Sequence, residues 1–180
     1  MTDFNWSRTY LSGHKLKTSG VIATLVLRYL YTLLFLGGFI HKIVHGWIWT
    51  DIMTKHFIKE LNVLRAPPQS GPLEALATLA APYQANYLEH FALPLVIPIA
   101  WIVTVGELII GVAMLLGVTT RINAAFGLFL LLNFAAGGYC NWTIPPLVTM
   151  SVLFMVLPTG HWLGLDRNLN RKYPDSIWFK

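Results

Sequence analysis

Two charged side chains interrupt long apolar stretches of the sequence, which makes them candidate functional residues. Arg28 lies in a stretch over about residues 19–47, and Glu107 is the one Asp, Glu, Lys or Arg over residues 92–118. A charge in lipid costs about 3 kcal/mol on insertion scales, so both should face other helices and be paired. At about 1.5 Å per residue, both lie roughly 13–15 Å from the same side of the membrane. We therefore predict an interhelical Arg28–Glu107 ion pair, which either sets helix register or belongs to a site.

Three further polar side chains cluster at the far end of the first apolar stretch. His41 and His45 are four residues apart, so on a helix they share one face and could together hold a metal. No HExxH glutamate or paired cysteine accompanies them, and we expect no metal. With Lys42 they could donate hydrogen bonds to a quinone carbonyl or an anion. The alternative is that Lys42 snorkels and the histidines are interfacial, which we expect for His56 and His90.

The other polar candidates point to structural roles. Asn133 lies inside the third apolar stretch, where we expect it to hydrogen-bond a neighbouring helix. Cys140 is the single cysteine, which excludes an internal disulfide and a thiolate metal cluster. The sequence has no GxGxxG, Walker, GxSxG or CxxCH motif, so we expect no covalently bound cofactor.

The composition predicts an integral membrane protein. Of 180 residues, 55% are hydrophobic and 12% charged, against about 25% charged in soluble domains. Seven Trp, seven Tyr and ten Phe exclude a disordered chain. The net charge is +5. In so apolar a chain, surplus Lys and Arg more often orient a membrane protein in the bilayer than bind nucleic acid.

The predicted fold is all-α, a bundle of four transmembrane helices in a single domain over residues 1–180. Residues 122–165 carry no charge, and these 44 residues exceed twice the roughly 20 that one span needs. This stretch must fold back once, and residues 137–142 are its most turn-rich part. Pro145 and Pro146 fit the first turn of the last span, and Pro158 should kink or fray its last turn. The expected spans cover about residues 19–47, 92–118, 120–138 and 143–162.

The segment over residues 48–90 is predicted to form an amphipathic helical cap outside the membrane. Apolar residues recur at helical spacing over residues 48–64, with Trp47 and Trp49 as interfacial anchors. A second short helix should cover residues 73–81 and close at Pro82.

The distribution of Lys and Arg predicts that both termini are cytoplasmic. With four spans, eight basic residues share the side of the termini, and three lie in the segment between the first two spans. The eight are Arg8, Lys15, Lys17, Arg121, Arg167, Arg171, Lys172 and Lys180, and the three are Lys55, Lys59 and Arg65.

Four short blocks together resemble the DoxX/DoxD-like membrane protein family. The blocks cover all four expected spans. Each block alone is short, and their order and spacing together carry the resemblance. They are Leu27-Arg28-Tyr29 with Gly37-Gly38-Phe39-Ile40-His41-Lys42; Gly106-Glu107-Leu108-Ile109-Ile110-Gly111 with Leu115-Leu116-Gly117-Val118-Thr119-Thr120-Arg121; Asn133-Phe134-Ala135-Ala136-Gly137; and Gly160-His161-Trp162-Leu163-Gly164-Leu165-Asp166.

The resemblance implies a small subunit of a redox complex in a prokaryotic inner membrane. The DoxD branch is similar to the membrane subunit of thiosulfate:quinone oxidoreductase, which works with a second subunit. Under this hypothesis Arg28, Glu107, His41, Lys42 and His45 form a polar pocket for a quinone. A noncatalytic accessory subunit of a larger membrane complex is the alternative. A transporter ranks last, because the sequence has no inverted repeat.

Overall fold

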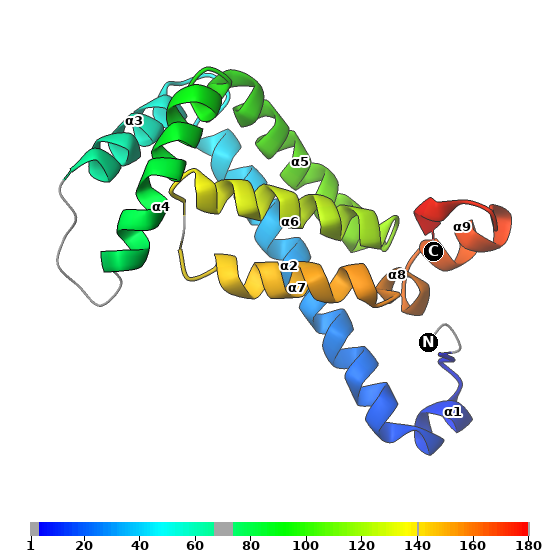
Figure 1. The fold of residues 1–180 in the computed structure, drawn as a ribbon. Coiled ribbons are helices and arrows are strands. Elements are labelled where there is room, and N and C mark those ends of the chain that lie inside the picture. The colour runs from blue at the N-terminus through cyan, green and yellow to red at the C-terminus, as the bar shows by residue number, and fades with distance from the viewer. Residues whose placement is uncertain (1–3, 67–73, 140, 180) are drawn as a thin grey trace.

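The computed structural model describes residues 4–66, 74–139 and 141–179, and all regular structure within them is helical. Four helices form the body of the molecule, and the others lie at its two ends (Figure 1). The elements are α1 (Arg8–Gly13), α2 (Lys15–Val44), α3 (Ile52–Arg65), α4 (Glu74–Tyr87), the π-helical turn η1 (Leu88–Ala92), α5 (Val96–Leu116), α6 (Thr120–Ala136), α7 (Ile144–Val156), α8 (Thr159–Trp162), α9 (Asp166–Lys172) and the 3-10 turn η2 (Ile177–Phe179).

Two of the four body helices are long and apolar enough to cross a membrane by length and composition. α2 has 30 residues and α5 has 21, or about 45 and 31 Å, against a hydrocarbon core of about 30 Å. The buried core helix of a soluble protein can meet the same criterion. α6 and α7 are apolar but shorter, with 17 and 13 residues.

The shorter α7 departs from the expected span over residues 143–162, and a proline explains where it ends. Pro145 and Pro146 lie in its first turn, as predicted. At the other end Leu157 is extended, and Pro158 precedes the separate α8. Proline disfavours helical backbone in the residue before it, so the helix stops where a kink was expected.

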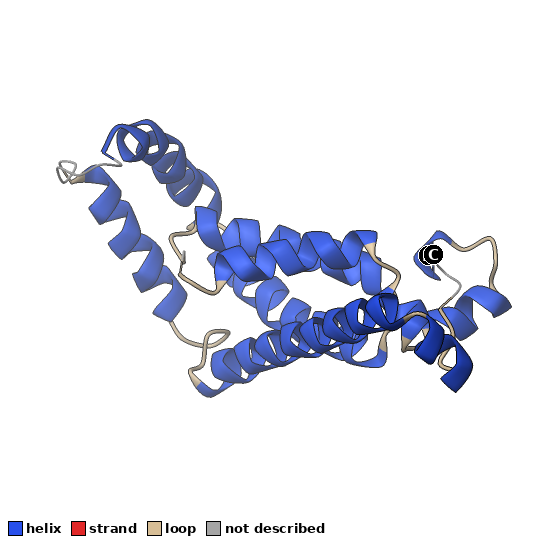
Figure 2. Ribbon diagram, turned by 90° about the horizontal axis from the view of Figure 1, so that it is seen from below, coloured by secondary structure: helices blue, strands red, loops and turns tan. Residues whose placement is uncertain are grey.

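The four body helices pack around one apolar core. α2 and α5 are antiparallel, since Gly38 lies against Glu107, Leu36 against Gly111 and Arg28 against Gly117. α6 and α7 form a second antiparallel pair beside them (Figures 1 and 2). The α5–α6 turn needs Gly117, whose φ is +63° and whose Cβ position is filled by the backbone of Gly164. Large side chains buried most deeply in the core include Tyr31, Ile110, Met114, Leu130 and Phe154.

α3 and α4 form an arm at the end of the bundle away from the chain termini (Figure 1). Met53, Phe57 and Leu61 recur every four residues on α3 and are buried against Leu88 and neighbouring side chains.

The predicted closure of the second arm helix at Pro82 is wrong, because Pro82 lies inside α4. The chain stays helical through η1, where Leu88 and Ala92 are fully buried against α3 and α5. This packing outweighs the loss of one backbone donor at Pro82. Leu73, the expected first residue of that helix, and Cys140 lie outside the described residues.

Asp166 ties the C-terminal segment to the start of α6. Its carboxylate accepts hydrogen bonds from the backbone N–H groups of Thr119 and Thr120, at 2.6 and 3.1 Å, and from the Thr120 hydroxyl at 2.9 Å. An acidic group here satisfies free donors and complements the helix dipole. The carbonyl oxygens of Leu116 and Gly117 accept backbone hydrogen bonds from Leu165 and Asp166.

Candidate functional site

A buried ion pair joins α2 to α5. Lys42 Nζ donates to Glu107 Oε1 at 2.7 Å and to Oε2 at 2.8 Å, and both side chains are less than a tenth exposed. The antiparallel register brings the end of α2 to the middle of α5. Gly38 leaves room for the carboxylate, since a Cβ there would lie 3.0 Å from both Glu107 oxygens. Glycine at this position therefore lets Glu107 reach Lys42.

The predicted Arg28–Glu107 pair is wrong, because the two residues lie at different levels of the bundle. Arg28 lies beside Gly117, ten residues or about 15 Å along α5 from Glu107. α2 begins at Lys15 and is nine residues longer than α5. The N-terminal part of α2 therefore extends beyond the end of α5. A depth counted in residues from the expected start of the first span thus placed Arg28 too far into the bundle.

Arg28 is fully buried and connects α2 to the C-terminal segment. Its Nη1 donates to the carbonyl oxygen of Thr159 at 2.8 Å, and its Nη2 donates to the Tyr29 hydroxyl at 3.3 Å. These contacts anchor α8 against α2, and Arg28 is not part of the pocket described next.

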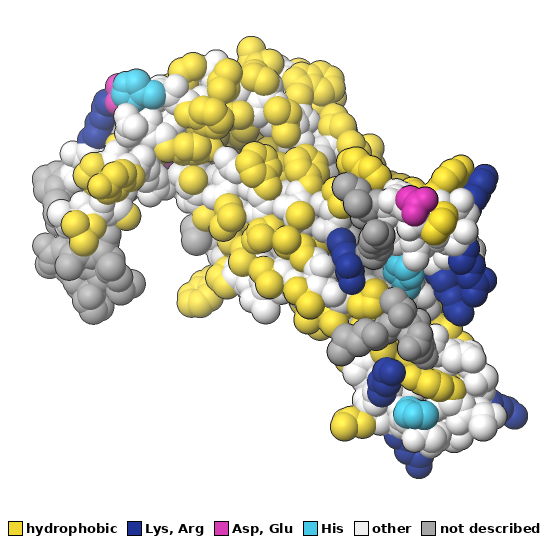
Figure 3. Space-filling view, turned by 45° about the vertical axis from the view of Figure 1, so that its right-hand side comes forward, with side chains coloured by type: hydrophobic (Ala, Val, Ile, Leu, Met, Phe, Trp, Pro, Cys, Tyr) yellow, Lys and Arg dark blue, Asp and Glu magenta, His cyan; other side chains and the backbone are white. Residues whose placement is uncertain are grey.

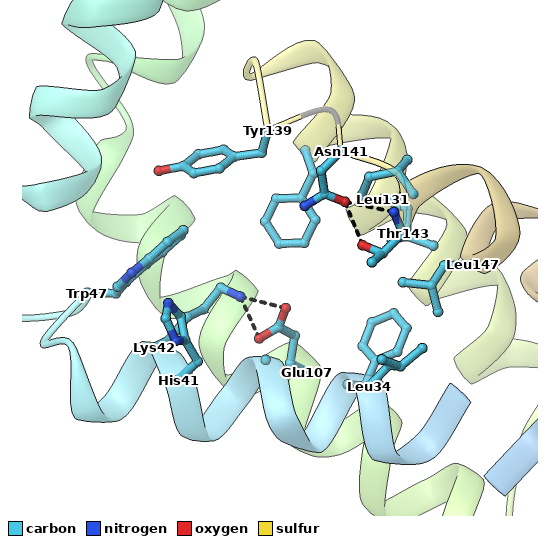
Figure 4. Close-up of a pocket in the computed structure, with 14 residues that line it drawn as sticks. Leu34, His41, Lys42, Trp47, Glu107, Leu131, Tyr139, Asn141, Thr143 and Leu147 are labelled. Carbon is cyan, nitrogen blue, oxygen red and sulfur yellow. Dashed lines mark hydrogen bonds and ion pairs between the residues drawn. The ribbon is translucent and has the colours of Figure 1, made fainter. Parts of the chain in front are cut away.

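The Lys42–Glu107 pair lines a pocket of about 340 Å³ between α2, α5, α6 and α7. Figure 4 shows the two side chains pointing toward each other at its wall. Lys42 Nζ also lies 4.8 Å from the ring centre of Trp47 and 5.1 Å from that of Phe134. The ammonium group is thus held by a carboxylate and two aromatic faces. Aliphatic side chains of α2, α6 and α7 form much of the remaining wall, namely Leu34, Leu131, Ile144 and Leu147.

The structure brings His41 into the pocket but leaves His45 outside its lining. Both histidines are exposed, their ring centres are 4.0 Å apart, and His45 Nδ1 lies 2.8 Å from the carbonyl oxygen of His41. The part of the chain that the structure describes holds no group of three or more His, Cys, Asp or Glu side chains arranged to bind a metal.

Asn133 makes the interhelical hydrogen bond that was predicted for it. Its Oδ1 accepts from the Tyr87 hydroxyl at 3.0 Å, and its Nδ2 donates to the carbonyl oxygen of Phe129 at 2.8 Å. The partner helix is α4 of the arm, so Asn133 joins the arm to the bundle.

The α6–α7 loop supplies pocket residues that sequence reasoning missed. Asn141 Oδ1 accepts hydrogen bonds from the backbone N–H of Thr143 at 3.0 Å and from its hydroxyl at 2.6 Å. This turn starts α7 and places both residues at the pocket (Figure 4). The turn-rich composition of residues 137–142 signals the loop, but no local pattern shows that it returns to Lys42.

Tyr139 forms the pocket wall nearest the arm and stacks on His56 of α3. The ring centres are 3.6 Å apart, and Tyr139 Oη and His56 Nε2 are both buried without a hydrogen-bond partner. Burial raises the pKa of the Tyr139 hydroxyl well above its usual range, and burial lowers the pKa of His56. The His56 ring therefore packs face to face against Tyr139 of the loop.

Comparison with known proteins finds no family model, curated protein or solved structure that matches this chain. The resemblance to DoxX/DoxD-like proteins therefore stays a prediction. The fold and site define an all-helical protein with two helices of membrane-spanning length and a partly apolar pocket around a buried Lys–Glu pair.

Proposed function

We propose that this protein is a four-span membrane protein whose Lys42 pocket binds the head group of a membrane quinone. In this proposal it is the membrane subunit of a quinone-linked redox complex, resembling that of thiosulfate:quinone oxidoreductase. The observation that carries the proposal is the buried Lys42–Glu107 pair, set in a pocket with aromatic and aliphatic walls. Pockets of about this size commonly hold small ligands with a few placed polar groups.

The surface supports a position in the membrane. Hydrophobic side chains cover a broad face of the bundle, while Lys and Arg gather at the end that carries α1 and α9 (Figure 3). Such an arrangement fits an apolar belt in lipid with the basic end in the cytoplasm. In the proposed orientation both termini are cytoplasmic, in a prokaryotic inner membrane. α6 then completes the bundle as a short span, and α7, about 20 Å long, crosses together with α8, which follows it after Pro158. The arm lies at the outer surface.

The charge of the pocket favours a neutral ligand. Glu107 neutralises Lys42 at hydrogen-bonding distance, so a small anion gains little net electrostatic attraction there. A quinone ring is neutral and planar, and its carbonyl oxygens accept hydrogen bonds from an ammonium group. Trp47 and Phe134 line the pocket beside Lys42 and add aromatic surface that a planar ring can contact.

The same residues suit the reduction of a quinone. Converting a quinone to a quinol adds two electrons and two protons to its oxygens. The electrons come from a second subunit, with thiosulfate as the expected donor. Lys42 stabilises the negative charge that develops on the nearer oxygen. Glu107, which is ionised in the pair, relays a proton from water to that oxygen, and the second proton reaches the other oxygen from water.

Trp47 provides a direct test, since quinones quench tryptophan fluorescence. Detergent-purified protein is titrated with a tail-less benzoquinone, and saturable quenching is expected. Trp47→Phe should remove most of this quenching, whereas Trp101→Phe, on the exposed face of α5 away from the pocket, should retain it. Lys42→Met should weaken binding by about tenfold, as expected for losing one charged hydrogen bond. Quenching that does not saturate, or that Trp47→Phe leaves unchanged, contradicts the proposal.

An accessory role in a larger membrane complex is the second candidate, and the arm favours it. Ile58, Val63, Leu79 and Tyr83 are large apolar side chains on α3 and α4, and each is at least 46% exposed. Exposed apolar side chains on a projecting arm fit contact with another subunit. Native mass spectrometry of gently solubilised membranes tests this role. A stoichiometric partner supports it, and migration as a lone monomer contradicts it.

A further inference from the structure

A second, smaller cavity lies next to the Lys42 pocket. It has a volume of about 110 Å³ and lies between α3, η1, α5 and α6. Phe134 and Tyr139 line both cavities, so these two side chains form the partition between them. A flexible chain attached to a ligand in the first cavity therefore needs only one of these side chains to turn aside to reach the second.

The walls of the second cavity suit an apolar occupant. Among the described residues that line it none is charged, and the polar ones are Tyr87, Asn133 and Tyr139. Tyr87 and Asn133 already hydrogen-bond each other at 3.0 Å. An ionic or strongly polar ligand would have few partners here, whereas a hydrocarbon chain needs none.

The second cavity also leads to the apolar surface of the bundle. Phe91, Ile102 and Phe129 line it and are about half exposed, at 46%, 52% and 55%. In the proposed membrane arrangement these side chains face lipid. The two cavities thus lie side by side between Lys42 and the exposed side chains of Phe91, Ile102 and Phe129, with Phe134 and Tyr139 between them. They join into one path to the bilayer when one of these two aromatic side chains turns aside.

We propose that the ligand is a quinone with an isoprenoid tail and that the first isoprenoid unit occupies this second cavity. At about 30 Å³ per water-sized group, 110 Å³ accommodates roughly four carbon groups, which is most of one five-carbon isoprenoid unit. This inference rests on the proposed function, because it needs a quinone head group beside Lys42. The competing route for a tail leaves the Lys42 pocket directly, past exposed lining residues such as Leu34 of α2 and Thr143 near the start of α7.

The test compares a tail-less benzoquinone with its one-isoprenoid homologue in two matched variants. Ile102→Trp enlarges a side chain at the mouth of the second cavity. Ile109→Trp makes the same change two turns further along the same face of α5, at an equally exposed isoleucine that lines neither cavity. The tail also partitions into detergent, but this effect is the same for both variants. It therefore cancels when the dissociation constants of the two variants for the same quinone are compared as a ratio.

Ile102→Trp should reduce the affinity for the prenylated quinone by about tenfold, the effect of losing the burial of about two methylene groups. Its affinity for the tail-less quinone should stay within about twofold of wild type, and Ile109→Trp should change neither. Equal loss for both quinones, or no loss for either, overturns the tail site while the proposed function stands. If no quinone binds the wild-type protein, both proposals fall.

A photoreactive group at the end of the isoprenoid unit gives an answer in the wild-type protein, whether or not Ile102→Trp folds. Cross-links to η1, or to the parts of α5 and α6 that carry Ile102 and Phe129, support the proposed path. Cross-links confined to α2 and α7 would show that the tail leaves by the mouth of the Lys42 pocket and would overturn the inference.

Discussion

Removing one partner of the Lys42–Glu107 pair should destabilise the fold more than removing both. The two side chains are 8% and 6% exposed and are joined by hydrogen bonds of 2.7 and 2.8 Å. Breaking a buried pair costs about 3–5 kcal/mol, because the remaining charge is left without its partner. The adjoining pocket can admit water, so we expect about 3 kcal/mol for Lys42→Met and for Glu107→Leu alone.

The double variant should recover part of this loss. Two apolar side chains leave no stranded charge, so the combined effect should fall below the sum of the single effects by about 2 kcal/mol or more. The assay is a double-mutant cycle in which thermal or denaturant unfolding is measured in detergent. Intrinsic tryptophan fluorescence monitors the unfolding.

A second cycle with Arg28→Leu and Glu107→Leu is the control. The structure places these residues at different levels of the bundle, and their effects should add within about 0.5 kcal/mol. Strong coupling in the Arg28 cycle, or additive effects in the Lys42 cycle, would refute the helix register described above.

Three further predictions concern the ends of the bundle and the arm. Asp166→Ala should lower the free energy of unfolding by about 2 kcal/mol, since it removes the acceptor that caps α6; the exposed Asp175→Ala should have little effect in the same thermal assay. Burial lowers the pKa of His56 in the folded state, so the unfolded chain binds more protons as the pH falls through about 6.5, and stability is lost in and below that range. His56→Phe should flatten this loss in melting curves taken between about pH 5 and 8, and His90→Phe, at an exposed position, should not. Gly117→Ala should destabilise by more than about 1 kcal/mol because of its positive φ and the backbone of Gly164, whereas Gly37→Ala, in open space within α2, should be neutral or stabilising. A reversal of the last two effects in thermal unfolding would contradict the described α5–α6 turn.

Local sequence patterns are enough to place the body helices and the two arm helices, although they misplace the ends of α4 and α7. The charge-free residues 122–165 predict a helical hairpin, and the structure forms it as α6 and α7. The turn-rich residues 137–142 predict its reversal, and Pro145 and Pro146 fit the first turn of α7. Asn133 was expected to bond another helix because a buried amide in an apolar environment needs a partner.

Tertiary structure decided which side chains meet. Glu107 needed a buried partner on energetic grounds, and residue counting predicted Arg28. The partner is Lys42, because the pairing depends on how far α2 slides along α5. Gly38 and the overhang of α2 set this register and bring Lys42 to Glu107. Packing also carried α4 through Pro82, since burial of Leu88 and Ala92 outweighs one lost donor. The pocket likewise depends on contacts between residues far apart in sequence, from Leu34 to Leu147, which no local pattern encodes.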